Sequence, residues 1–64
     1  MEAWQQRVVE EERELAARIE RLDTFIEGPG VLLGGPTRQR EQLVRQRAIM
    51  VQYVNILRER IGDF

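Results

Sequence analysis

Few side chains in this sequence could act as catalytic groups. Its 64 residues include no His, Cys, Lys or Ser, so the available groups are carboxylates, Thr24, Thr37 and Tyr53. None of them stands in a spacing that pairs a nucleophile with a general base. The acid-rich run at 10–14 points in successive directions around a helix, so its carboxylates do not converge on a metal ion. We therefore predict no enzyme, no catalytic residue, no bound metal and no cofactor.

Arginine and aromatic side chains offer a different chemistry. Two predicted helices would place Arg7, Arg18, Tyr53 and Arg60 along one flank of a hairpin, with Trp4 near its open end. Guanidinium forks bind phosphates bidentately and aromatic rings stack on bases, so this flank suits a nucleotide. The alternative is that these Arg side chains pair with Glu of the first helix and with acids of a neighbouring subunit. Trp4 is likewise either a packing residue or a stacking platform.

Two amphipathic helices must position these groups. The first is expected at about residues 2–27, and its apolar face consists of Trp4, Val8, Leu15, Ile19, Leu22 and Ile26. The second is expected at about residues 37–61, and its apolar seam consists of Leu43, Met50, Val54, Leu57 and Ile61. Gly28, suited to a left-handed C-cap, and Pro29, which cannot continue a helix, should end the first helix. The predicted fold class is all-α.

Residues 28–36 form the expected turn, because four Gly and two Pro occupy these nine positions. A Gly-rich segment can cradle a phosphate, but this one follows no strand and lacks the GxxxxGK[ST] spacing. Its glycines therefore indicate a turn and not a phosphate-binding loop. Thr37 suits the N-cap of the second helix.

The short turn also predicts how the helices face each other. Helices of similar length joined by such a connection pack antiparallel. Both helices rise by the same amount per residue, so a turn centred near Leu32 places Asp23 opposite Arg40. The same register places Trp4 near Arg60 and Ile61, at the open end of the hairpin.

Apolar side chains outside the seam predict self-association. Val44 and Val51 lie on one side of the second helix, and Ile49, Tyr53 and Ile56 lie on the other. A chain of this length buries only about 60% of its unfolded surface, and without Cys it has no disulfides to compensate. We therefore expect a single domain, residues 1–64, that assembles into a symmetric homo-oligomer.

Charge is divided unequally along the chain. Residues 2–27 contain eight acids and four Arg, whereas residues 37–61 contain six Arg and two Glu. These halves complement each other within a chain and between chains. The net charge is −1, which indicates no DNA or RNA polymer as a partner. The exclusive use of Arg among basic residues fits either a composition bias or selection for carboxylate and phosphate binding.

No signal peptide and no membrane-spanning apolar run are present, so we expect a cytoplasmic protein without a membrane partner.

The order of the helical residues resembles a known family. The distinctive parts are an opening with Trp4, Gln5, Arg7 and Val8, and an ending with Met50, Tyr53, Ile56, Leu57, Arg60 and Ile61. This pattern is similar to the small phage-encoded helical hairpin of anti-CBASS cyclic-oligonucleotide sponges, which is shared with a sponge family that counters the Thoeris defence. The resemblance covers nearly the whole chain.

The resemblance implies a non-enzymatic phage protein that works in the cytoplasm of an infected bacterial host. Related sponges are hexamers that sequester cyclic dinucleotides and cyclic trinucleotides between subunits. By resemblance, Trp4 would stack on a base, Arg18 or Arg21 would meet the phosphates, and Arg60 would serve a separate trinucleotide site. The family more commonly has Tyr as the opening aromatic residue and Lys as the basic residue.

A second hypothesis comes from the apolar stripes alone. The same surfaces could dock another protein's helix, which would make the chain a structural or regulatory helical oligomerisation module. Binding of cyclic nucleotides separates the two hypotheses, because a ligand of the folded state raises its stability.

Overall fold

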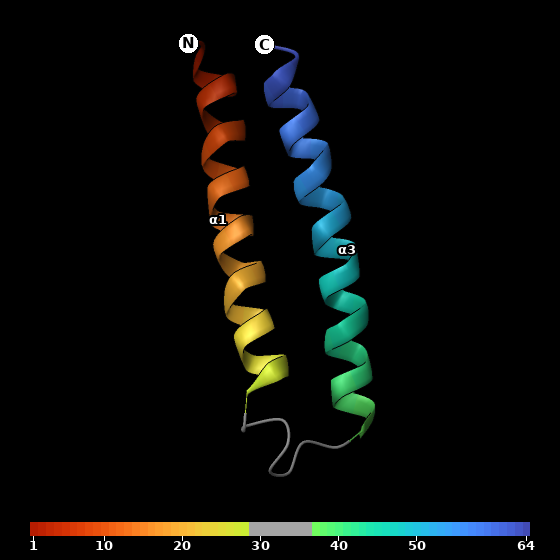
Figure 1. The fold of residues 1–64 in the computed structure, drawn as a ribbon. Coiled ribbons are helices and arrows are strands. Elements are labelled where there is room, and N and C mark those ends of the chain that lie inside the picture. Colours follow the sequence, from red (N-terminus) through yellow and green to blue (C-terminus); the bar gives the residue numbers. More distant parts are fainter. Residues whose placement is uncertain (29–36) are drawn as a thin grey trace.

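The structure is an antiparallel pair of helices. The computed structural model describes residues 1–28 and 37–64, with the side chain of Thr37 excepted. Helix α1 spans Ala3–Glu27 and helix α3 spans Thr37–Gly62 (Figure 1). The two chain ends lie at the same end of a rod that measures 46 × 15 × 13 Å. The predicted all-α hairpin is confirmed, and its assembly into an oligomer stays a prediction.

The start of α1 is stabilised by a side chain of its first turn. The Glu2 backbone N–H donates to Gln5 Oε1 at 2.8 Å, and the Gln6 N–H donates to the Glu2 carbonyl at 3.1 Å. Backbone N–H groups at the start of a helix have no acceptor within the helix. The side-chain oxygen of Gln5 provides an acceptor for one of them. Gln5 is therefore held in one orientation.

The end of α1 comes at Gly28, as predicted, but not in the predicted conformation. Gly28 has φ −85° and ψ 171°, which is extended backbone and not left-handed. The residue before a proline is driven toward extended conformations, and Pro29 follows. Glycine is still required here, because a Cβ at this position would lie 2.6 Å from the Thr24 carbonyl oxygen. The rest of the predicted turn, residues 29–36, lies outside the described residues.

The second helix begins at Thr37, the residue expected to cap it, and ends at Gly62.

The core of the hairpin is one seam between the helices. Val8 and Leu15 of α1 and Val54 and Leu57 of α3 are buried, and Leu57 has no exposed surface at all. Partly buried apolar side chains that pack against these four are Ala16, Ile19, Met50 and Ile61. Burial of such side chains contributes roughly 1.5–3 kcal/mol each. Trp4, expected on the apolar face, instead keeps 49% of its surface exposed.

Ion pairs between the helices reveal the register of their side chains. Arg47 donates through two nitrogens to the carboxylate of Asp23, and the Nη2–Oδ2 distance is 3.3 Å. The prediction that Asp23 faces Arg40 is therefore wrong, because its partner lies about two turns further along α3. Arg58 Nε pairs with Glu12 Oε2 at 3.1 Å on the same flank.

The lean of helical side chains explains this shift. Every side chain leans toward the N-terminus of its own helix. In an antiparallel pair the two sets therefore lean past each other. The two Arg–carboxylate pairs consequently join residues that lie later in both helices than the backbone levels suggest.

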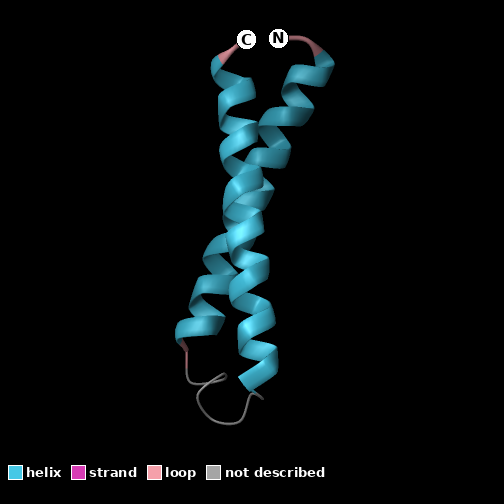
Figure 2. Ribbon diagram, turned by 90° about the vertical axis from the view of Figure 1, so that its right-hand side faces the viewer, coloured by secondary structure: helices cyan, strands magenta, loops and turns pink. Residues whose placement is uncertain are grey.

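Much apolar surface stays uncovered in one hairpin. On α3, Ile49, Ile56 and Tyr53 expose 67%, 52% and 43% of their surface, and on α1 Phe25 exposes 48%. Figure 2 shows the helices crossing near their middle, so they diverge toward both ends. Neither α1 nor α3 carries an apolar stretch long enough to span a bilayer.

Leu57 provides a direct test of the seam. Leu57→Ala should lower the free energy of unfolding by about 2–5 kcal/mol, because it removes a fully buried side chain and leaves a cavity. Urea unfolding followed by far-UV circular dichroism measures the change. Gln52→Ala, on the exposed surface of α3, is the control and should change stability by no more than about 0.5 kcal/mol. Equal effects of the two substitutions would contradict this core.

Candidate functional site

A cavity lies at the open end of the hairpin, between the start of α1 and the end of α3. Its volume is about 350 Å³. The residues that line it are Trp4, Gln5, Arg60, Asp63 and Phe64. The predicted proximity of Trp4 and Arg60 is therefore observed. The cavity combines an aromatic wall with a cation, a carboxylate and an amide.

The aromatic wall consists of two rings in edge-to-face contact. The centroids of Trp4 and Phe64 are 5.2 Å apart and the ring planes meet at 80°. Such pairs are favourable because the positive edge of one ring meets the negative face of the other. Trp4 remains half exposed while Phe64 restrains it. Its exposed surface is therefore held in one orientation at the cavity.

Arg60 supplies the cation. It lies in the last turn of α3, where the helix dipole favours positive charge. In the described parts of the chain, ion pairs join Arg47 to Asp23 and Arg58 to Glu12, and neither includes Arg60. The same holds for Arg7, so the alternative of pairing with acids of α1 is not seen for either residue within one hairpin.

Tyr53 lies about two turns before Arg60 on α3. Its hydroxyl donates to Glu11 Oε2 at 2.7 Å and so ties α3 to α1. This hydrogen bond is the main reason why the pKa of Tyr53 is raised, with smaller contributions from partial burial and from the Glu11 charge. The positive charge of Arg60 acts in the opposite direction. The pKa of Tyr53 therefore depends on the charges of both Glu11 and Arg60.

None of the predicted basic residues of α1 belongs to the described lining of this cavity. Arg7 follows Trp4 by about one turn, on the exposed surface. Arg18 and Arg21 are also exposed, but they lie about 21 Å and about 25 Å along the helix from Trp4. A single hairpin therefore brings Trp4 and Arg60 together at the cavity, and Arg7, Arg18 and Arg21 lie outside its described lining.

Comparison with known families gives one match. A family model described as Sequestin covers residues 2–63. The chain belongs to the Sequestin family. Comparison with curated proteins and with solved structures found no match. The family name suggests sequestration of some ligand, which agrees with a binding role for a small two-helix protein.

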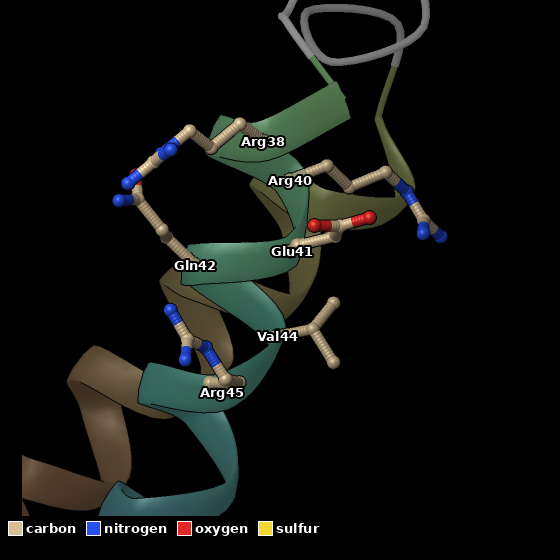
Figure 3. A pocket seen from close by; sticks show the side chains of 6 residues that line it. All are labelled: Arg38, Arg40, Glu41, Gln42, Val44 and Arg45. Atoms are coloured by element: carbon tan, nitrogen blue, oxygen red, sulfur yellow. The ribbon is translucent and has the colours of Figure 1, made fainter.

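A second cavity of this Sequestin member lies near the start of α3. Its volume is about 510 Å³, and its described lining consists of Arg38, Arg40, Glu41, Gln42, Val44 and Arg45. Figure 3 shows the side chains of Arg38 and Arg40 pointing to opposite sides of the helix. No aromatic ring belongs to that described lining. This cavity could attract an anion but offers no platform for a base, so the open end is the better candidate.

Three lining residues of the open-end cavity were not predicted from the sequence. Gln5, Asp63 and Phe64 are polar or lie beyond the last apolar seam position, so periodicity does not single them out. The predicted register nevertheless indicated that Asp63 and Phe64 lie near the cavity. The pairing of Trp4 with Arg60 also brings the residues after Ile61 to the start of α1. Among described residues, no group of three or more acidic side chains is placed to hold a metal ion.

The Tyr53–Glu11 hydrogen bond predicts a loss of stability at high pH. The folded protein raises the pKa of Tyr53 above its unfolded value of about 10. The stabilisation is therefore complete below pH of about 10 and disappears as pH rises through the folded pKa. Tyrosinate absorbance, compared between native and urea-unfolded protein, reports the two pKa values, since Tyr53 is the only Tyr.

Glu11→Gln is the matched control, because it keeps a hydrogen-bond acceptor and removes the negative charge. The Tyr53 pKa in this variant should move only part of the way back toward its ordinary value, because the charge of Glu11 is a smaller cause of the shift than the hydrogen bond. A native Tyr53 that titrates at or below the unfolded value would contradict the hydrogen bond.

Proposed function

We propose that the protein is a phage sponge that sequesters cyclic dinucleotide or cyclic trinucleotide messengers. By withholding the messenger from host effectors, it would block CBASS-type antiviral signalling in the infected bacterium. The observation that carries the proposal is the open-end cavity, where the exposed Trp4 ring and the guanidinium of Arg60 stand together. The Sequestin match and the resemblance to cyclic-oligonucleotide sponges support it.

Both chemical parts of such a messenger, the base and the phosphate, have a counterpart in this cavity. A base can stack on Trp4, which adds about 1–3 kcal/mol per stacked base. A phosphate can take a bidentate hydrogen bond from Arg60, and Arg7 adds positive charge about one turn from Trp4. The chain as a whole has a net charge of −1, so attraction of an anionic ligand depends on these local cations.

Sequestration without turnover follows from the available groups. The cavity offers no His, Cys, Lys or Ser, because the chain contains none. A ligand that binds there meets no nucleophile paired with a base, so it should be released unchanged. Release of intact ligand on denaturation therefore distinguishes a sponge from a nuclease.

An oligomer would complete the site. Ile49, Tyr53 and Ile56 form an exposed apolar stripe on α3, which a second copy of the chain would cover. In such an assembly, which we propose to be a hexamer as in related sponges, Arg18 and Arg21 of one subunit can approach a ligand that touches another. This arrangement gives those two residues the phosphate role that the resemblance implies.

The same exposed stripe favours a second candidate, a structural or regulatory module that binds another protein's helix. The two functions differ in their dependence on Trp4 and Arg60, which a docking stripe on Ile49 and Ile56 does not require. Ligand binding decides between them. If a panel of cyclic dinucleotides and trinucleotides gives no thermal shift, the helix-docking module becomes the better explanation.

Changes to the apolar stripe test the assembly. Replacing Ile49 and Ile56 together by Glu should convert the oligomer to monomers, because charged side chains cannot be buried in an apolar interface without a large cost. Light scattering and sedimentation measure the mass. Ala48→Glu combined with Gln52→Glu introduces the same two charges on the exposed surface outside this stripe and should leave the assembly intact. A wild-type protein that is a folded monomer at micromolar concentration would overturn the proposal of an oligomer.

Changes to the cavity test the ligand. Trp4→Ala should weaken binding of a cyclic dinucleotide by about 1–3 kcal/mol per stacked base, and Arg60→Ala should weaken it through loss of a charge-assisted contact. Titration calorimetry with cyclic dinucleotides and trinucleotides measures both effects. Arg13→Ala removes an equal charge from the exposed surface of α1 and should leave binding unchanged.

The two ligand classes also test whether Trp4 and Arg60 act together. Since both residues line one cavity, each variant should lose affinity for the same ligands. Selective losses, with Trp4→Ala affecting dinucleotides and Arg60→Ala affecting trinucleotides, would instead support two separate sites. Melting of the oligomer without loss of binding in the residual folded protein would contradict both assignments.

A further inference from the structure

Asp63 has no evident role in binding an anion, although it lines the open-end cavity with Trp4 and Arg60. Its backbone N–H donates to the carbonyls of Glu59 and Arg60, both at 3.1 Å, so its position follows from the end of α3. It is the one side-chain carboxylate among the described lining residues. Any ligand on Trp4 and Arg60 must therefore be compatible with this negative charge.

Two local electrostatic rules are broken at Asp63. A carboxylate at the C-terminal end of a helix is disfavoured by the helix dipole. A carboxylate beside a phosphate-binding Arg also repels the phosphate. Within the described residues no ion pair engages Asp63. Residues that break local rules without local compensation are expected at functional sites.

Hydrogen-bond chemistry indicates what would compensate. An ionised carboxylate only accepts hydrogen bonds, and its two oxygens can accept two parallel ones. The Watson–Crick edge of guanine presents two adjacent donors, its ring N–H and its exocyclic amino group. Adenine presents one amino donor beside a ring nitrogen that accepts, so it can satisfy only one carboxylate oxygen. Bases that are out of a duplex are commonly read on this edge.

Gln5 complements this pattern. Its Oε1 accepts the Glu2 backbone N–H at 2.8 Å, so the Nε2 group is left as a donor. Gln5 also lines the cavity, and guanine carries a carbonyl oxygen next to its ring N–H. The cavity thus offers two acceptor oxygens on Asp63 and a donor on Gln5, which is the complement of guanine.

We propose that Asp63 is the base-reading residue of the open-end cavity and selects a guanine base stacked on Trp4. This inference rests on the proposed function, since it names the base preferred at that same site. Phe64 has a positioning role, because its edge-to-face contact restrains the Trp4 ring beside Asp63.

The experiment compares cyclic di-guanylate with cyclic di-adenylate, which carry the same phosphates and differ in their bases. Trp4 is the only Trp, so quenching of its fluorescence reports stacking directly. The wild-type protein should bind cyclic di-guanylate about tenfold more tightly. Asp63→Asn, which keeps one acceptor oxygen and loses the charge, should reduce that preference to about twofold or less. Glu59→Gln removes an equal charge from the exposed surface of α3 and should preserve it.

The outcomes separate this inference from the proposed function. If both ligands quench Trp4 with equal affinity, the sponge stands and guanine selection by Asp63 is wrong. If the preference persists in Asp63→Asn, another group reads the base. If neither these ligands nor any cyclic trinucleotide binds, the proposed function itself fails.

Discussion

The hairpin depends on a single apolar seam. Four side chains, Val8 and Leu15 from α1 with Val54 and Leu57 from α3, form the whole buried core among the described residues. Such a core leaves little stability in reserve for a chain of this size. The Tyr53–Glu11 hydrogen bond is exposed and the interhelical ion pairs are only partly buried, so these contacts orient the helices more than they stabilise them. In the oligomer that we propose, further copies of the chain would supply the missing burial.

The two flanks of the seam differ in their chemistry. On one flank, Arg47 and Arg58 form ion pairs with acids of α1. These ion pairs fix the register of the two helices. On the other, Tyr53 is held by Glu11 while Arg60 has no described ion-pair partner. Cations that are not committed to structural pairs are those free to bind a ligand. In the function that we propose, the ligand therefore binds on the side and at the end where Arg60 lies.

The sequence predicted what depends on periodicity, and missed what depends on side-chain direction. Apolar spacing and Gly28–Pro29 were enough for the two helices and the end of the first, and equal helix length brought Trp4 to Arg60. Asp23 was assigned the wrong partner because backbone levels ignore the lean of side chains. Asp63 and Phe64 carry no periodic signal, so their place in the cavity emerged only from the structure.

The position of the chain ends has a consequence for anything attached to them. Both ends lie at the same end of the rod as the cavity (Figure 1), and Phe64 itself forms part of the cavity wall. Any peptide joined before Met1 or after Phe64 would leave the fold at the mouth of the site. Short extensions there could alter access to the cavity without contacting the apolar seam. Sequence changes at the chain ends can therefore leave the stability of the fold unchanged. An affinity tag at either end would lie next to the cavity and could affect binding measurements there.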